Sequence, residues 1–248
     1  MKKIALILLS FCFLLSSCKN KDDGSIIYNG PKTIDIVLLE IYSLGATSTE
    51  AITYSSDNKL IVDIDQTGRI LGRNVGETYI TLSNSKDEIR LHVVVSLFEE
   101  PTLEFGASKE YIKSLYGEPK HDKNEVLIYG SGNDWYSYAV WEMDFFFENN
   151  RYYESNLYIR SDLDLRIEQY LADNYFFLQE VTDTIDNEIK TLYVYLNDPE
   201  PENATVIVGK QYDAGPENDI LLVYAPFSIE KGRSSEHTDF VNRIRKRD

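Results

Sequence analysis

Cysteine is almost absent from this chain of 248 residues: there are two, Cys12 and Cys18, and both lie near the N-terminus. The chain beyond Cys18 contains no thiol, which excludes disulfide bonds, cysteine nucleophiles and cysteine-liganded zinc from it. Its stability must therefore come from packing. Hydrophobic residues make up 43% of the sequence, which suffices for one or two ordinary cores.

Histidine is also scarce, with only His92, His121 and His237. The sequence contains no Gly-x-Ser-x-Gly elbow, no His-Glu-x-x-His helix and no Gly-rich phosphate loop. A triad can assemble from residues far apart in sequence, so hydrolase activity stays open as a third hypothesis. We assign no catalytic residue and expect a protein that is not an enzyme.

One segment partly matches the start of a calcium-binding loop, with Asp63, Asp65, Thr67 and Gly68. An EF-hand needs a bidentate Glu at its twelfth position, where this chain has Asn74. We therefore expect a hairpin turn, no metal site and no cofactor.

Basic residues are under-represented, with 25 Lys and Arg against 41 Asp and Glu and a net charge of −16. Nucleic-acid binding depends on Lys and Arg at phosphates, so nucleic acid is excluded as a partner. The same charge argues against a protein that lies flat on anionic lipid.

No hydrophobic run is long enough to cross a bilayer. The longest, Ile4 to Leu15, has about a dozen residues, whereas a spanning helix needs roughly 20. It follows Lys2 and Lys3 and precedes small residues, which is the pattern of a signal peptide covering residues 1–17.

The end of this segment, Leu15-Ser16-Ser17-Cys18, resembles the lipobox of bacterial lipoproteins. The resemblance implies cleavage before Cys18 and a lipidated Cys18, palmitate included, that anchors residues 18–26 as a tether. The charged stretch Lys19–Ser25 is similar to signals that export lipoproteins to the outer face of the outer membrane. We expect a surface-exposed outer-membrane protein. A periplasm-facing position, or an ordinary secretory signal with an incidental cysteine, stays open.

Residues 27–97 predict short strands separated by turns. Thr78, Ile80 and Leu82 alternate with polar positions, as do Leu91, Val93 and Val95. The run of residues 52–95, with its small and hydrophobic positions (Ile52, Ser55, Ser56, Val62, Asp63, Gly68, Ile70, Gly72, Gly76, Ile80, Val95), resembles a group 2 bacterial immunoglobulin-like domain. That family implies an all-β sandwich that acts as a spacer or binding module.

Residues 103–248, after a boundary at Glu99-Glu100-Pro101, mix predicted helices and strands. Ser108 can cap a helix with Ile112, Leu115 and Tyr116 on one face, and Ser161 a second helix with an apolar stripe (Leu163, Ile167, Tyr170, Leu171). The stretch 139–147 predicts a strand with one buried face (Ala139, Trp141, Met143, Phe145, Phe147) and with Glu142 and Asp144 on the other.

The same order of elements then recurs. Strands at 125–129, 138–147 and 153–159 match strands at 190–196, 204–208 and 219–225, so we expect two helix-plus-three-strand units. The predicted fold class is an immunoglobulin-like sandwich followed by an α+β domain, with an antiparallel sheet and helices on one side. The segment 105–119 resembles the helix opening of β-lactamase-inhibitor-protein-like and envelope assembly lipoproteins. A last short helix is expected at 236–246.

An aromatic loop is the strongest candidate binding site. Small residues lead into Asn133, Asp134, Trp135, Tyr136 and Tyr138, whose flat faces and polar edges suit sugar or peptide contacts. The competing interpretation is that Trp135 and Tyr136 only begin the next strand and enter the core. We expect a non-catalytic surface protein that binds a glycan or protein ligand. The alternative is a structural or assembly lipoprotein within the envelope.

Overall fold

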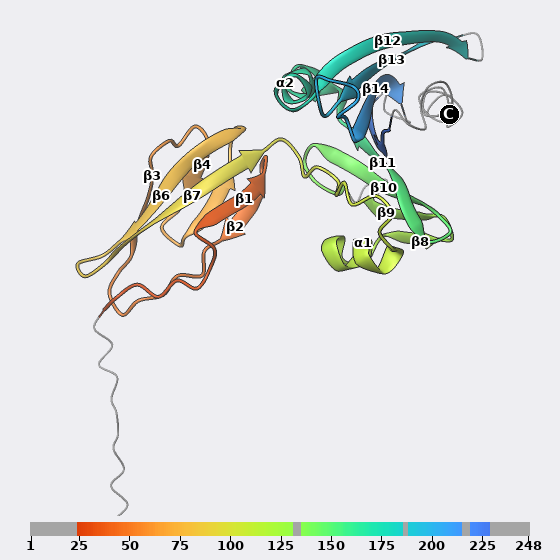
Figure 1. Cartoon of the computed structure of the whole chain (residues 1–248). Coiled ribbons are helices and arrows are strands. Elements are labelled where there is room, and N and C mark those ends of the chain that lie inside the picture. The colour runs from red at the N-terminus through yellow and green to blue at the C-terminus, as the bar shows by residue number, and fades with distance from the viewer. Residues whose placement is uncertain (1–23, 131–134, 186–187, 215–218, 229–248) are drawn as a thin grey trace, which may run out of the picture.

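The computed structural model describes residues 24–130, 135–185, 188–214 and 219–228. About half of these residues lie in β-strands, which form sheets of four, three and eight strands (Figure 1). The expected signal peptide, Cys18 and the helix at 236–246 lie outside the described residues. None of the described helices is long and apolar enough to cross a bilayer.

The first region, residues 24–96, contains two facing sheets in the orders β1-β7-β6-β3 and β2-β5-β4. Hydrophobic side chains from both sheets form one core, which includes Ile36, Ile70, Ile80 and Val93. The strands are β1 (Thr33–Val37), β2 (Ile41–Ser43), β3 (Thr53–Ser56), β4 (Val62–Ile64), β5 (Arg69–Gly72), β6 (Gly76–Ser83) and β7 (Glu88–Ser96).

The predicted alternation in this region is confirmed. Ile80 and Leu82 of β6 are fully buried, as is Val93 of β7, whereas their sequence neighbours are more exposed. The turn between β4 and β5 is the expected hairpin: Asp65 accepts hydrogen bonds from the backbone and hydroxyl of Thr67 and from the Arg69 N–H. The sequence predicted short strands over residues 27–97 but not the parallel pairing of β1 with β7.

The second region, residues 103–228, is built on one eight-stranded antiparallel sheet in the order β12-β13-β14-β15-β11-β10-β9-β8. Its elements are α1 (Lys109–Tyr116), β8 (His121–Lys123), β9 (Val126–Gly130), β10 (Val140–Glu148), β11 (Arg151–Ile159), a 3₁₀ turn (Ser161–Leu163), α2 (Asp164–Asn174), β12 (Phe176–Ile185), β13 (Glu188–Leu196), β14 (Val206–Ala214) and β15 (Asp219–Pro226).

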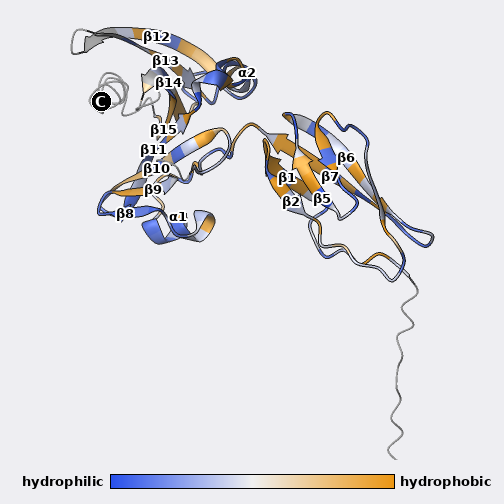
Figure 2. Ribbon diagram, turned by 180° about the vertical axis from the view of Figure 1, so that it is seen from behind, coloured by the Kyte–Doolittle hydropathy of each residue, from blue (hydrophilic) through white to orange (hydrophobic). Residues whose placement is uncertain are grey.

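Both helices pack on the same face of this sheet. Ile112 of α1 and Ile167 and Leu171 of α2 belong to one core with Phe145 and Leu157 of the sheet. A separate apolar cluster, with Val194 and Val223, occupies the opposite face. Figure 2 shows hydrophobic segments along the strands of both regions, with hydrophilic residues at turns and helix surfaces.

The repeated unit is a helix followed by four strands, and the prediction of three strands was wrong. Each unit has one strand that the sequence did not predict: the short β8 in the first and the ten-residue β12 in the second. The order in the sheet is mirrored about the central β11–β15 pair.

One face assignment in β10 was also wrong. A register shift between Val140 and Glu142 turns Trp141 away from Met143, so that its ring contacts Tyr158 on the other face, at 5.2 Å between centroids. Val140 enters the helix-side core instead. Asp144, expected on a solvent-facing side, is only 6% exposed.

The predictions for the two helices are confirmed only in part. Ser108 caps α1, its side chain accepting the Tyr111 N–H, as predicted. Leu115 of α1 is half exposed, contrary to the predicted stripe. The second helix starts two residues later than expected, because Ser161 begins a 3₁₀ turn and Leu163 occupies the N-cap position.

Buried tyrosines give the fold a defined response to high pH. Burial raises the pKa of Tyr116, Tyr129 and Tyr212 from 10.0 to about 12. Because the folded state favours the neutral phenol, this contribution to stability is complete below about pH 10 and is lost as the pH rises through about 12. We expect the melting temperature to fall steeply across that interval. Tyrosinate absorbance that reaches its full amplitude near pH 10 in the folded protein would contradict this.

Candidate functional site

The aromatic loop lies between β9 and β10, and its backbone is held by a tight turn. The Ser137 N–H donates to the Val140 carbonyl at 2.8 Å, and the Val140 N–H donates to Ser137 Oγ at 3.2 Å. Gly130 at the end of β9 has φ +71°, and a Cβ there would lie 2.3 Å from the Trp141 carbonyl oxygen. Only glycine fits this close approach, so the sequence fixes where the loop leaves the sheet.

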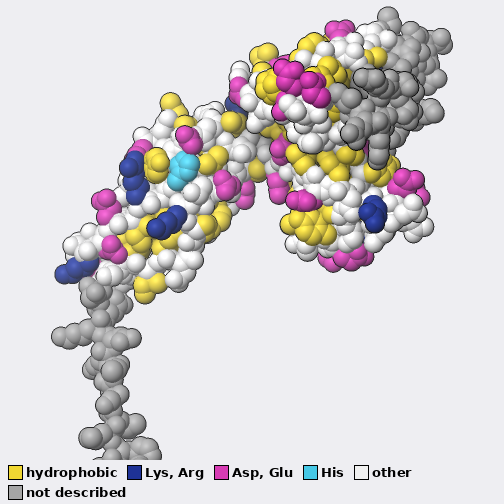
Figure 3. Space-filling view, in the orientation of Figure 1, with side chains coloured by type: hydrophobic (Ala, Val, Ile, Leu, Met, Phe, Trp, Pro, Cys, Tyr) yellow, Lys and Arg dark blue, Asp and Glu magenta, His cyan; other side chains and the backbone are white. Residues whose placement is uncertain are grey.

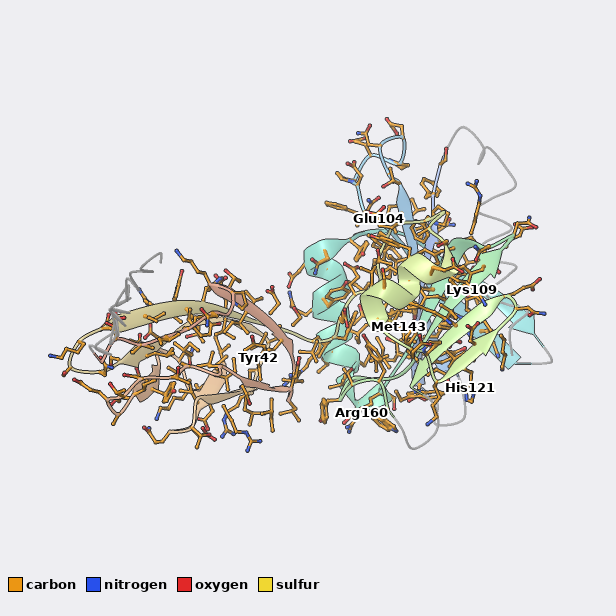
Figure 4. The ribbon with its side chains drawn as sticks, turned by 90° about the horizontal axis from the view of Figure 1, so that it is seen from below. Tyr42, Glu104, Lys109, His121, Met143 and Arg160 are labelled. Atoms are coloured by element: carbon orange, nitrogen blue, oxygen red, sulfur yellow. The ribbon has the colours of Figure 1, made fainter. Side chains whose placement is uncertain are left out.

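Trp135 and Tyr138 lie at the surface beside the same cationic side chain, Arg160. Their side chains are 45% and 36% exposed, and the Arg160 guanidinium lies 5.6 Å from the Trp135 ring centroid and 4.6 Å from that of Tyr138. Such distances allow cation–π attraction. Arg160 is labelled at the margin of the second region in Figure 4, whereas Met143 lies among its packed side chains.

Asp162 fixes the orientation of this cation. Its two carboxylate oxygens accept hydrogen bonds from Arg160 Nε at 2.9 Å and Nη2 at 2.7 Å. These hydrogen bonds raise the pKa of Arg160. Trp135, Tyr138, Arg160 and Asp162 are called the aromatic surface below. It offers flat apolar faces beside a charged hydrogen-bonding group.

Tyr136 points away from the aromatic surface. Its hydroxyl donates to the Glu99 carboxylate, and its ring meets Tyr129 edge-on, 6.5 Å between centroids. Burial, followed by the Glu99 carboxylate, raises its pKa well above the ordinary value. The structure therefore brings two of the five predicted residues together and gives Tyr136 a structural contact. Asn133 and Asp134 lie outside the described residues.

A cavity of about 390 Å³ adjoins the aromatic surface, where the two regions meet. One wall is the turn from Val37 to Glu40, the other is formed by Tyr136, Ser137 and Tyr138, and Glu99 lies between them. Tyr138 belongs to both the cavity and the aromatic surface. We call this space the junction cavity. Sequence reasoning missed it because its two walls are about a hundred residues apart.

The junction is held by apolar packing. Leu38, Leu97 and Phe98 are each no more than 5% exposed and belong to the core of the second region. The Phe98 ring lies 4.7 Å from that of Tyr170, and the Glu100 carboxylate accepts hydrogen bonds from Tyr170 and Tyr175. A second, larger cavity of about 970 Å³ lies on the α2 side of the same linker.

A buried lysine forms a polar cluster with side chains of α2 and with Tyr212. Lys210 of β14 is fully buried, and its Nζ donates to Asp164 Oδ1 at 2.7 Å, to Glu168 and to the Tyr212 hydroxyl. Burial alone would lower the pKa of Lys210, but the hydrogen bonds to Asp164, Glu168 and Tyr212 together raise it. The contacts with Asp164 and Glu168 join α2 to β14 of the sheet, so the cluster has a structural role.

The described histidines do not gather into a site. His92 lies within β7 beside Glu77, at 3.1 Å, and His121 begins the exposed strand β8. Within the described ranges, no group of three or more His, Cys, Asp or Glu side chains is placed to hold a metal ion.

No protein-family model matches the chain, and no curated protein matches its sequence.

Proposed function

We propose that this chain is a lipid-anchored protein of the bacterial cell envelope that binds a glycan or protein ligand without catalysis. The lipobox-like segment ending at Cys18 supports the anchor. The two facing sheets of residues 33–96 support the resemblance to an immunoglobulin-like spacer, which would hold the second region away from the membrane. The repeated helix-plus-strands unit supports an α+β ligand-binding region.

The observation that carries the proposal is the aromatic surface. Large aromatic side chains are normally buried, yet Trp135 and Tyr138 are exposed together and share one oriented cation. Trp, Tyr and Arg are enriched among the residues that contribute most to binding energy at protein interfaces, and flat aromatic faces also suit the apolar faces of sugars. Acidic side chains spread over both regions, as Figure 3 shows, agree with a ligand other than nucleic acid.

The test uses the chain from Gly24 to Asp248, which contains every described residue, on an array of glycans and extracellular proteins. We expect Trp135→Ala to weaken retention of the bound ligand at least tenfold with an unchanged melting temperature. Leu165→Ala is the matched control, because Leu165 is 85% exposed on α2 and lies outside the aromatic surface. Equal binding by wild type and Trp135→Ala would refute the proposed site.

A structural or assembly role within the envelope is the second candidate, and one observation favours it. The edge strand β12 begins with three exposed apolar side chains, Phe176, Phe177 and Leu178, and no described strand pairs with its outer edge. Such edges can accept a further strand from a partner. Protease added to intact cells separates the candidates, because a surface receptor is cleaved and a periplasmic assembly protein is protected.

A further inference from the structure

Leu39 adopts a backbone conformation that leucine normally avoids. It lies in the turn between β1 and β2 with φ +62°, where its N–H donates to the Gly72 carbonyl at 2.8 Å and the Glu40 N–H donates to Val37 at 3.0 Å. The other described non-glycine residues with positive φ are Asn149 and Asn150. Asparagine tolerates this conformation well, whereas a bulky side chain is strained in it.

The fold itself gives no reason for a leucine here. Leu38 is 5% exposed and packs into the core of the second region, but Leu39 is 44% exposed. A glycine or asparagine would relieve the backbone strain without the loss of a core contact. Strain of this kind clusters at functional sites, including active sites and ligand clamps.

The Leu39 side chain belongs to the junction cavity. It lies on the wall opposite Tyr136, Ser137 and Tyr138, and Glu40 and Glu99 line the same space. The volume of about 390 Å³ lies within the range of small-molecule sites. Because Tyr138 is shared with the aromatic surface, a ligand in the cavity can extend over Trp135.

We propose that the junction cavity binds a neutral saccharide between Leu39 and Tyr138, so that both regions of the chain form one site. This inference rests on the proposed function and names its ligand class. The apolar faces of a sugar ring pack against Leu39 and Tyr138, and its hydroxyls donate to Glu40 and Glu99, since each carboxylate can accept several hydrogen bonds. An acidic sugar is disfavoured because the same carboxylates repel it.

The experiment titrates the Gly24–Asp248 chain with neutral oligosaccharides (xylo-, malto- and chito-oligosaccharides) and with acidic ones (polygalacturonate and hyaluronan fragments). We expect a neutral saccharide to bind. Leu39→Gly should weaken the affinity for it at least tenfold, while the melting temperature of the variant equals or exceeds that of the wild type. Asn149→Gly is the matched control, since it changes another positive-φ residue outside the cavity. Its binding should equal that of the wild type.

The possible failures are distinguishable. If Trp135→Ala weakens binding but Leu39→Gly does not, the two-walled cavity is wrong and the aromatic surface stands. If only acidic saccharides bind, or a protein binds through Trp135 and no saccharide does, the ligand class is wrong and the proposed function stands. If nothing binds, or if neither Trp135→Ala nor Leu39→Gly weakens binding, both proposals fail; if Leu39→Gly alone weakens it, the aromatic surface is wrong and the cavity stands.

Discussion

The double variant Asp164→Asn/Glu168→Gln is expected to lose about 3 kcal/mol of unfolding free energy. Both carboxylates contact Lys210 Nζ, whose side chain is 0% exposed. Without them the buried Lys210 loses both anionic partners and must either stay charged in an apolar site or give up its proton, and either is far more costly than the loss of an exposed ion pair. Urea unfolding, followed by the circular dichroism of the sheet, measures the change.

Substitution of the lysine instead of its two carboxylate partners should lower the unfolding free energy much less. Lys210→Met removes the buried charge and leaves Asp164 and Glu168, which are 38% and 45% exposed and can be hydrated again. The triple variant that combines all three changes should recover most of the stability lost by the double variant. A double variant no less stable than Lys210→Met, or a triple variant no more stable than the double, would contradict this account.

Phe98→Ala is expected to cost about 3 kcal/mol, since the ring is 3% exposed and packs on Tyr170 at the junction. Removal of the ring leaves a cavity that the linker cannot fill, because Leu97 and Leu38 beside it are already buried. Leu60→Ala is the matched control: its side chain is 75% exposed in the first region, and we expect a change within about 0.5 kcal/mol. The midpoint of urea unfolding reports both variants. A loss below about 1 kcal/mol for Phe98→Ala would show that the linker is not anchored as described.

Local signals predicted a large part of the fold. The alternation in β6 and β7 depends on neighbouring residues alone, and so does the Ser108 cap of α1; both are confirmed. The parallel pairing of β1 with β7 was not predicted, because it leaves no hairpin turn in the sequence. Strand β12 was missed because three consecutive apolar residues at its start hide the alternation, and a register shift lies between Phe177 and Gln179. The same kind of shift reversed the face of Trp141.

The candidate site was predictable only in part. The exposed pair Trp135 and Tyr138 was predicted from the composition of the loop. Arg160 was not, because β10 and β11 separate it from this pair in the sequence and no local pattern relates them. Leu39 and Lys210 depend on contacts with residues far away along the chain. Their roles follow from a backbone angle and from burial, neither of which single-sequence patterns report.

The central claim is that the aromatic surface binds the ligand. Its most direct test is a calorimetric titration of the strongest array ligand against the wild-type chain from Gly24 and the double variant Trp135→Ala/Tyr138→Ala. We predict that the dissociation constant rises at least a hundredfold, since each aromatic contact contributes on the order of 1–2 kcal/mol, and that the melting temperature is unchanged. Equal dissociation constants for the two proteins would contradict the account.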